Sequence, residues 1–195
     1  AQEVGLFRSM DGGDSWTFLL SPNADNVALD DTSPNILYVH GPGHPGDSPP
    51  LYRSVNGGDT WEVLDVSFPV TETDGRYCWR SEQLKPYVVS GVLYVSACGH
   101  GGMYSGLVKS TDHGDTWEAV VDGMTDSQIT DLAFHPQDPN TLYAGTANGN
   151  VFISDDGGDS WSLSSQPVGY VHELEVNPFG SHEVWVAAES RFGDD

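Results

Sequence analysis

One short part of the chain gathers residue types that bind sugars and peptides. It carries arginines, aromatic residues and a glutamate, and a histidine and a tyrosine follow on the next irregular segment: Arg76, Tyr77, Trp79, Arg80, Glu82, His100 and Tyr104. Aromatic rings beside charged side chains suit a sugar or a peptide, and binding residues gather on loops held by a rigid scaffold. These seven are the candidate binding residues. The alternative is that the aromatic residues belong to a strand core and the arginines pair with the chain's many acids.

Metal binding receives weaker support from the sequence. His40, His44 and Asp47 could hold a metal ion, but they lie in a Pro-Gly segment where histidines are expected to be exposed. Calcium held by surface carboxylates is a minor alternative, and no EF-hand spacing is present. We therefore expect no cofactor.

No catalytic residue is predicted. A glycosidase needs two carboxylates about 5–10 Å apart, but with 29 acidic residues some pair will meet that distance by chance. There is no P-loop, dinucleotide fingerprint or serine nucleophile elbow. The sequence therefore favours a protein that is not an enzyme, with glycoside hydrolysis as the alternative.

Charge and hydropathy exclude two classes of partner. Twenty-nine acidic residues against seven lysines and arginines give a formal charge of −22, which repels phosphate backbones and makes nucleic acid an unsuitable partner. No apolar run approaches the roughly 18 residues of a membrane-spanning helix. The remaining acids are interpreted as a solvated surface.

The two cysteines, Cys78 and Cys98, flank a predicted turn at residues 86–91. If the two arms pair about residue 88, the cysteines fall opposite each other and can form a disulfide. A disulfide would indicate an extracellular or periplasmic protein. Two buried thiols are the alternative.

A single box recurs four times and organises the chain. It reads SMDGGDSW at residues 9–16, SVNGGDTW at 54–61, STDHGDTW at 110–117 and SDDGGDSW at 154–161, so that the copies start 45, 56 and 44 residues apart. Such a period indicates a repeat architecture. The box positions predicted to be structural are Ser9, Asp11, Gly13, Trp16, Ser54, Asn56, Gly58, Trp61, Ser110, Asp112, Gly114, Trp117, Ser154, Asp156, Gly158 and Trp161.

Each residue type in the box suits a tight reversal between two strands. The Asp or Asn can accept hydrogen bonds from backbone N–H groups within the turn. The glycine permits positive φ, and the tryptophan can wedge into the sheet. The box is therefore interpreted as architecture and not as an active site.

The boxes resemble the Asp-box, or BNR repeat, with the pattern Ser-x-Asp-x-Gly-x-Thr-Trp. Asn56 departs from this pattern, as do Ser15 and Ser160 in the Thr position, but all three keep the hydrogen-bonding groups. The resemblance implies a β-propeller, a fold shared by sialidases, xyloglucan-type glycoside hydrolases, sorting-receptor ectodomains and photosystem assembly factors. The lead-ins FRS, YRS and VKS and the segment DPNTLYAGT are more similar to the last three groups than to sialidases. Sialidases also use three arginines to bind the substrate carboxylate. Here Arg8 and Arg53 precede boxes on the structural side, so we do not expect sialidase activity.

Alternating apolar and polar residues around each box predict four antiparallel strands per unit, the content of one propeller blade. The expected fold is an all-β propeller forming one domain over residues 1–195. Its blades cover residues 26–66, 77–121 and 129–164, and a fourth joins residues 170–188 to 5–20. In the third unit, residues 77–84 and 91–98 are the expected inner strands. The alternative is that the chain forms part of a larger ring, for example one shared by two copies.

The function predicted from the sequence is a secreted, acidic, non-catalytic propeller that serves as a binding or structural module for a protein or glycan. The alternatives are a xyloglucanase-like glycoside hydrolase, or a piece of one, and a subunit of a larger assembly, which includes a homo-oligomer that completes a ring.

Overall fold

The computed structural model describes residues 5–20, 24–41, 50–68, 83–98, 105–126, 128–164, 169–179 and 183–190. All regular elements in these ranges are β-strands, and every strand pair is antiparallel. Within the same ranges there is no helix long and apolar enough to cross a membrane. The all-β prediction is confirmed.

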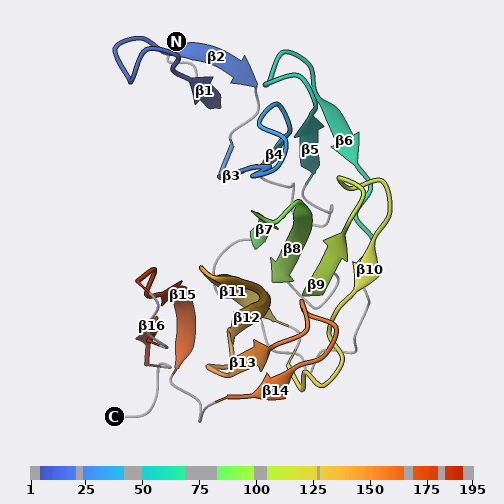
Figure 1. Ribbon diagram of the computed structural model, residues 1–195, viewed down its shortest axis with the longest axis vertical. Coiled ribbons are helices and arrows are strands. Elements are labelled where there is room, and N and C mark those ends of the chain that lie inside the picture. The colour runs from blue at the N-terminus through green and yellow to red at the C-terminus, as the bar shows by residue number, and fades with distance from the viewer. Residues whose placement is uncertain are drawn as a thin grey trace.

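Three complete blades, each a four-stranded sheet in sequence order, follow one another along an arc (Figure 1). The first contains β3 (Asn26–Leu29), β4 (Leu37–His40), β5 (Leu51–Ser54) and β6 (Glu62–Leu64). The second contains β7 (Gln83–Val89), β8 (Val92–Cys98), β9 (Ser105–Ser110) and β10 (Glu118–Ala119). The third contains β11 (Ile129–His135), β12 (Asp138–Thr146), β13 (Val151–Ser154) and β14 (Ser162–Leu163).

The two ends of the arc are half blades. β1 (Leu6–Arg8) pairs with β2 (Thr17–Leu20), and β15 (Tyr170–Val176) pairs with β16 (Val184–Glu189), as two separate sheets. Figure 1 shows these sheets at opposite ends of the arc. The shared blade expected from residues 170–188 and 5–20 is therefore not formed, and the structure is an open, partial propeller.

The inner hairpin of the second blade corrects the predicted register. β7 runs through Pro86 to Val89, and the turn consists of Ser90 and Gly91, with φ of 51° and 76°. Two consecutive residues with positive φ form the two-residue turn that matches strand twist. Pro86 is tolerated because, among the described strands, β7 has only β8 as a hydrogen-bonded neighbour, so its missing N–H breaks no second ladder there.

This register also overturns the predicted opposition of the cysteines. Cys98 pairs with Gln83, not with residue 78. Cys78 lies outside the described residues, so a disulfide stays a prediction without its cross-strand argument.

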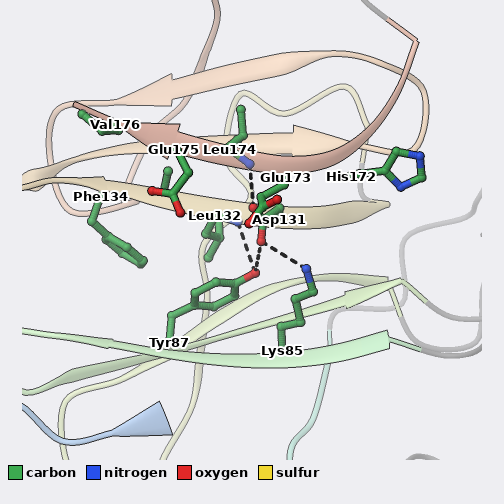
Figure 2. A pocket seen from close by; sticks show the side chains of 11 residues that line it. Lys85, Tyr87, Asp131, Leu132, Phe134, His172, Glu173, Leu174, Glu175 and Val176 are labelled. Atoms are coloured by element: carbon green, nitrogen blue, oxygen red, sulfur yellow. Dashed lines mark hydrogen bonds and ion pairs between the residues drawn. The ribbon is translucent and has the colours of Figure 1, made fainter. Parts of the chain in front are cut away.

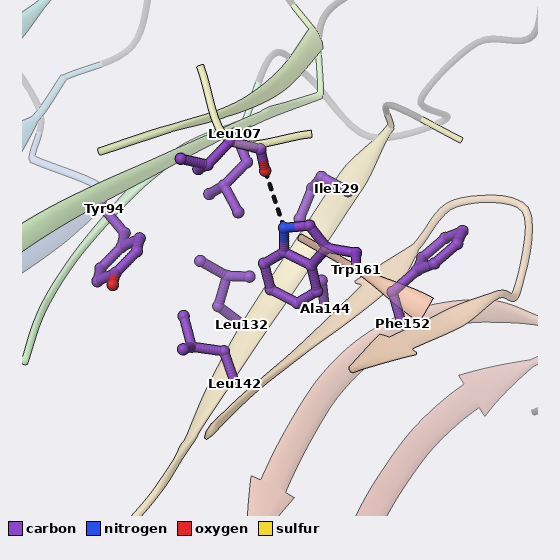
Figure 3. Close-up of a cluster of buried hydrophobic side chains, with 9 residues drawn as sticks. Tyr94, Leu107, Ile129, Leu132, Leu142, Ala144, Phe152 and Trp161 are labelled. Atoms are coloured by element: carbon purple, nitrogen blue, oxygen red, sulfur yellow. Dashed lines mark hydrogen bonds between the residues drawn. The ribbon is translucent and has the colours of Figure 1, made fainter. Parts of the chain in front are cut away.

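The hydrophobic core is divided among the contacts between consecutive blades. One cluster joins the second and third blades (Figure 3) and consists of Tyr94, Leu107, Val120, Ile129, Leu132, Leu142, Ala144, Phe152 and Trp161. A second joins the first and second blades, and a third joins the last complete blade to β15. Each blade therefore depends on its neighbours to bury its faces.

Candidate binding site on the inner strands

The binding residues predicted from the sequence all fall outside the described part of the chain, and so do His44 and Asp47. His40 is described and corrects an expectation. It is not exposed on a loop but 1% accessible at the end of β4, and neither ring nitrogen has a hydrogen-bond partner among the described residues. Burial lowers the pKa of His40, which favours the neutral ring.

The four boxes form the turns that join the third and fourth strands. In the last box, Ser154 Oγ accepts a hydrogen bond from Gly158 N at 2.9 Å and donates one to Asp156 at 2.8 Å. Asp156 in turn accepts hydrogen bonds from the backbone and hydroxyl of Ser160. The same backbone contacts recur in the other boxes. In the second, Asn56 Oδ1 accepts from Thr60 N, and Asn56 Nδ2 donates to the Thr60 hydroxyl at 2.9 Å. These polar side chains are engaged inside their own turns, which leaves them poorly placed to bind a ligand.

A cavity of about 570 Å³ lies between β7, β11 and β15, the inner strands of three successive sheets (Figure 2). Its lining residues are Lys85, Tyr87, Asp131, Leu132, Ala133, Phe134, His172, Glu173, Leu174, Glu175 and Val176. The polar members Lys85, Asp131 and His172 lie near the starts of their strands. Because strand direction alternates, that end of the blade is opposite the box turns.

Asp131 is the polar centre of this cavity and is fully engaged. Its Oδ1 accepts hydrogen bonds from Tyr87 Oη at 2.8 Å and Lys85 Nζ at 3.2 Å. Its Oδ2 accepts one from Leu174 N at 2.7 Å. The Asp131 side chain is 10% exposed, so it is an anion neutralised by a cation and donors from two neighbouring sheets. Asp131 thereby ties three sheets together.

Tyr87 is held as a hydrogen-bond donor by its surroundings. Burial, together with the charge of Asp131, raises its pKa well above 10. Its hydroxyl also accepts a hydrogen bond from Leu132 N at 3.2 Å. Phe134 packs beside it, with ring centroids 6.0 Å apart, and gives the cavity an aromatic wall.

The β15 side of the cavity carries carboxylates that are free to meet a ligand. The side chains of Glu173 and Glu175 are exposed and make no hydrogen bond or ion pair with other described residues. His172 is engaged, since its Nε2 lies 3.1 Å from Glu189 Oε2 and its ring packs on Tyr170. The cavity therefore offers two open acceptors beside an aromatic wall.

The sequence prediction missed this cavity. The sequence does contain a signal for it, because Leu-Tyr pairs recur at one position of the second strands. The residues that pair with Tyr94 and Tyr143 therefore mark equivalent positions on β7 and β11. Lys85 and Asp131 each lie two residues before the marked position, so they occupy the same level in adjacent blades. Opposite charges at one level of neighbouring blades predict a contact.

The candidate metal ligands His44 and Asp47 lie outside the described residues. Across the described ranges, no three His, Cys, Asp or Glu side chains converge to hold a metal ion.

Comparison with known proteins places this fold among characterised propellers. Residues 105–191 match the Sortilin-Vps10 family model, described as sortilin, neurotensin receptor 3. The chain is 28% identical over 165 residues to a probable oligoxyloglucan-reducing end-specific xyloglucanase of Neosartorya fischeri, a match that covers 79% of this chain and 19% of that protein.

Solved structures also support the propeller fold. The GH74 enzyme of Niastella koreensis superposes with a TM-score of 0.57 at 25% identity, over 77% of this chain and 24% of that one. YCF48 bound to D1 peptide gives a TM-score of 0.57 at 17% identity, over 95% and 55%. The chain is thus a propeller of the sialidase-, sortilin- and xyloglucanase-like kind, as its boxes predicted. It spans about a fifth of the curated relative and about a quarter of the GH74 structure.

Proposed function

We propose that this chain is a non-catalytic binding module of an extracellular protein and that it engages a glycan or protein partner at the inner-strand cavity. The observation that carries the proposal is the state of the cavity's carboxylates. Both oxygens of Asp131, the buried one, accept hydrogen bonds from within the protein, from Lys85, Tyr87 and a backbone N–H. These donors and the nearby cation stabilise the carboxylate, which disfavours it as a nucleophile or a proton donor.

The two free carboxylates are also badly arranged for hydrolysis. Glu173 and Glu175 are two residues apart on one strand, so they point to the same side and lie about 7 Å apart along it. A glycosidase pair must flank the scissile bond from both sides. Two acceptors on a single wall beside Tyr87 and Phe134 instead suit hydrogen bonding and stacking with a bound partner.

The proposal is tested by calorimetric titration of the chain with xyloglucan oligosaccharides and, separately, with D1 peptide, alongside an assay for reducing-sugar release. We expect one probe to bind, without hydrolysis. Glu175→Gln should weaken that binding, whereas Glu118→Gln on β10, an exposed change outside the cavity, should not. Equal binding by both variants, or sugar release lost in Glu175→Gln, would reject the proposal.

A second candidate is that the chain forms part of a xyloglucanase. It is supported by the 28% identity to the Neosartorya fischeri protein and by the GH74 superposition. In that case Glu173 or Glu175 would serve in catalysis, and Glu173→Gln and Glu175→Gln introduced into the intact gene product would abolish xyloglucan hydrolysis. An intact gene product that releases no sugar from xyloglucan would remove this candidate, whereas unchanged hydrolysis in both variants would exclude Glu173 and Glu175 as its catalytic residues.

The extracellular location is a separate part of the proposal, and it depends on a disulfide between Cys78 and Cys98, because a disulfide would indicate an oxidising compartment. Thiol titration of the unfolded chain with and without reductant tests it. We expect two thiols after reduction and none before, and two thiols in both samples would count against an oxidising compartment.

A further inference from the structure

The three contacts between consecutive boxed blades repeat one pattern of charge. In each contact, the residue just before the box serine of the preceding blade is basic and reaches the sixth residue, an aspartate, of the next box. Arg53 Nη1 lies 2.8 Å from Asp115 Oδ1, and Arg8 Nη2 lies 3.8 Å from Asp59. Lys109 makes the equivalent ion pair with Asp159. The basic partner always comes from the preceding blade.

An apolar contact accompanies each ion pair. The residue three positions after the box tryptophan packs on the glycine of the next box. A Cβ atom added to Gly58 would lie 2.8 Å from Leu19, and one added to Gly114 would lie 2.6 Å from Leu64. Val120 is the equivalent neighbour of Gly158, and its carbonyl oxygen accepts a hydrogen bond from Trp161 Nε1 at 2.9 Å.

The first box presents the same acceptor surface without a cover from the described residues. A Cβ atom on Gly12 would meet nothing within 4 Å, and one on Gly13 would meet only its own Trp16. Trp16 is 62% exposed, whereas Trp161 in the last box is 6% exposed. We call the surface formed by Gly12, Gly13, Asp14 and Trp16 the first-box face.

The chain's own last boxed blade does not carry the matching residues. Ile153 stands where the other blades have a basic residue, and Ser164 stands where they have Leu or Val. That blade retains only a tyrosine, Tyr143, equivalent to the Tyr94 that donates to Gly157 O. A ring could close if β1–β2 completed the β15–β16 sheet of the same copy or of a second copy. In either ring the blade β11–β14, which lacks the matching residues, would cover the first-box face.

We propose that the first-box face is an interaction surface for a different blade of the same repeat type. Its partner carries Lys or Arg directly before its own box serine and Leu or Val three residues after its box tryptophan. The inference rests on three interfaces of one design within the chain and on charge complementarity to Asp14. It stands independently of the function proposed for the cavity.

The matching blade can be built into the chain itself by the double change Ile153→Arg with Ser164→Leu. Acrylamide quenching of Trp16, isolated by subtracting the signal of Trp16→Phe from that of each protein, reports whether the face is covered. We expect Trp16 to be quenched freely in the wild-type chain and to lose that quenching in the double variant. Sedimentation then shows whether the cover comes from the same chain or from a second copy.

Charge reversal provides the matched controls. Adding Asp14→Lys to the double variant should restore quenching. A second double variant, Ile153→Glu with Ser164→Leu, should leave Trp16 quenchable, because it offers the aliphatic cover with the wrong charge. A folded Ile153→Arg, Ser164→Leu chain whose Trp16 stays quenchable would overturn the proposal. So would a wild-type chain in which Trp16 is already protected, because Ile153 and Ser164 would then suffice.

Discussion

The first and last boxes have the same internal structure but opposite surroundings. In both, the serine accepts a hydrogen bond from the backbone of the glycine four residues on, at 2.7 and 2.9 Å, and the aspartate accepts one from the backbone of the seventh residue at 2.9 Å. Yet the tryptophan is mostly exposed in the first box and buried in the last. The turn is therefore specified locally, whereas the packing of its tryptophan is supplied by the preceding blade.

The largest expected effect separates the two tryptophans. Trp161→Ala removes a buried ring and leaves two backbone acceptors without their N–H donor, so we expect the free energy of unfolding to fall by about 3–5 kcal/mol. Trp16→Ala should cost less than about 1 kcal/mol, because that ring is largely solvated. Urea unfolding followed by circular dichroism measures both, and similar losses would contradict the comparison.

The second-largest effect compares two residues at equivalent positions of inner strands, Asp131 on β11 and Asn26 on β3. Asp131→Asn removes the charge that meets Lys85 and places an amide donor among donors, which should cost about 2–3 kcal/mol. Asn26 holds the equivalent position in the first complete blade. Asn26→Ala should cost about 0.5 kcal/mol or less. The same urea assay decides, and equal costs would mean that Asp131 does not tie the sheets.

A smaller effect is expected where basic residues join blades. Arg53 donates to Glu62, Asp115 and the carbonyl oxygen of His113, with a side chain 12% exposed. Arg53→Lys keeps the charge but loses the planar guanidinium group that donates several hydrogen bonds at once, so the free energy of unfolding should fall by about 1 kcal/mol. Arg8→Lys, at the more exposed first interface, should stay within about 0.5 kcal/mol. Thermal unfolding of the two variants checks the order, and a larger loss for Arg8→Lys would reverse it.

The last prediction concerns pH and distinguishes the second box from the others. Hydrogen bonds from Thr116 lower the pKa of Asp112 to about 2, and those from Ser160 do the same for Asp156. Both values lie below the ordinary 3.8, so these turns are stabilised above pH 3.8 and lose that contribution as the pH falls toward 2. In the second box Asn56 stands in place of this aspartate, so that turn has no equivalent pH-dependent contribution.

Carbon-13 NMR titration of the box carboxyl groups measures these midpoints directly. Asn56→Asp should add a further carboxyl group with a depressed midpoint. Midpoints near 3.8 for Asp112 and Asp156 would show that the turn hydrogen bonds do not favour the charged form.

The blades can be predicted well from the sequence because four boxes locate the third and fourth strands. The prediction misplaces β7 because Pro86 suits a turn, although an inner strand with one hydrogen-bonded neighbour also accepts proline. It expects the His40 side chain to be exposed because glycine and proline follow that residue. The burial of His40 is a tertiary feature with no local signature.

The candidate site shows the same division between local and tertiary information. Asp131 looks unexceptional within the segment ITDLAFH, and its role arises only when Lys85, Tyr87 and Leu174 converge from two other sheets. The loop residues Arg76 to Glu82, with His100 and Tyr104, remain a prediction, because they lie outside the described ranges.

The one-way order of the blade contacts has a consequence for how such a chain can change in evolution. Each boxed blade after the first receives a cation and an aliphatic side chain on one side and, up to Lys109, offers the same pair on the other. A tandem duplication of one such unit would therefore insert a blade whose two sides already match its new neighbours. The array can lengthen or shorten by whole units at the first interfaces, whereas Ile153 and Ser164 mark a junction where such an exchange would not fit.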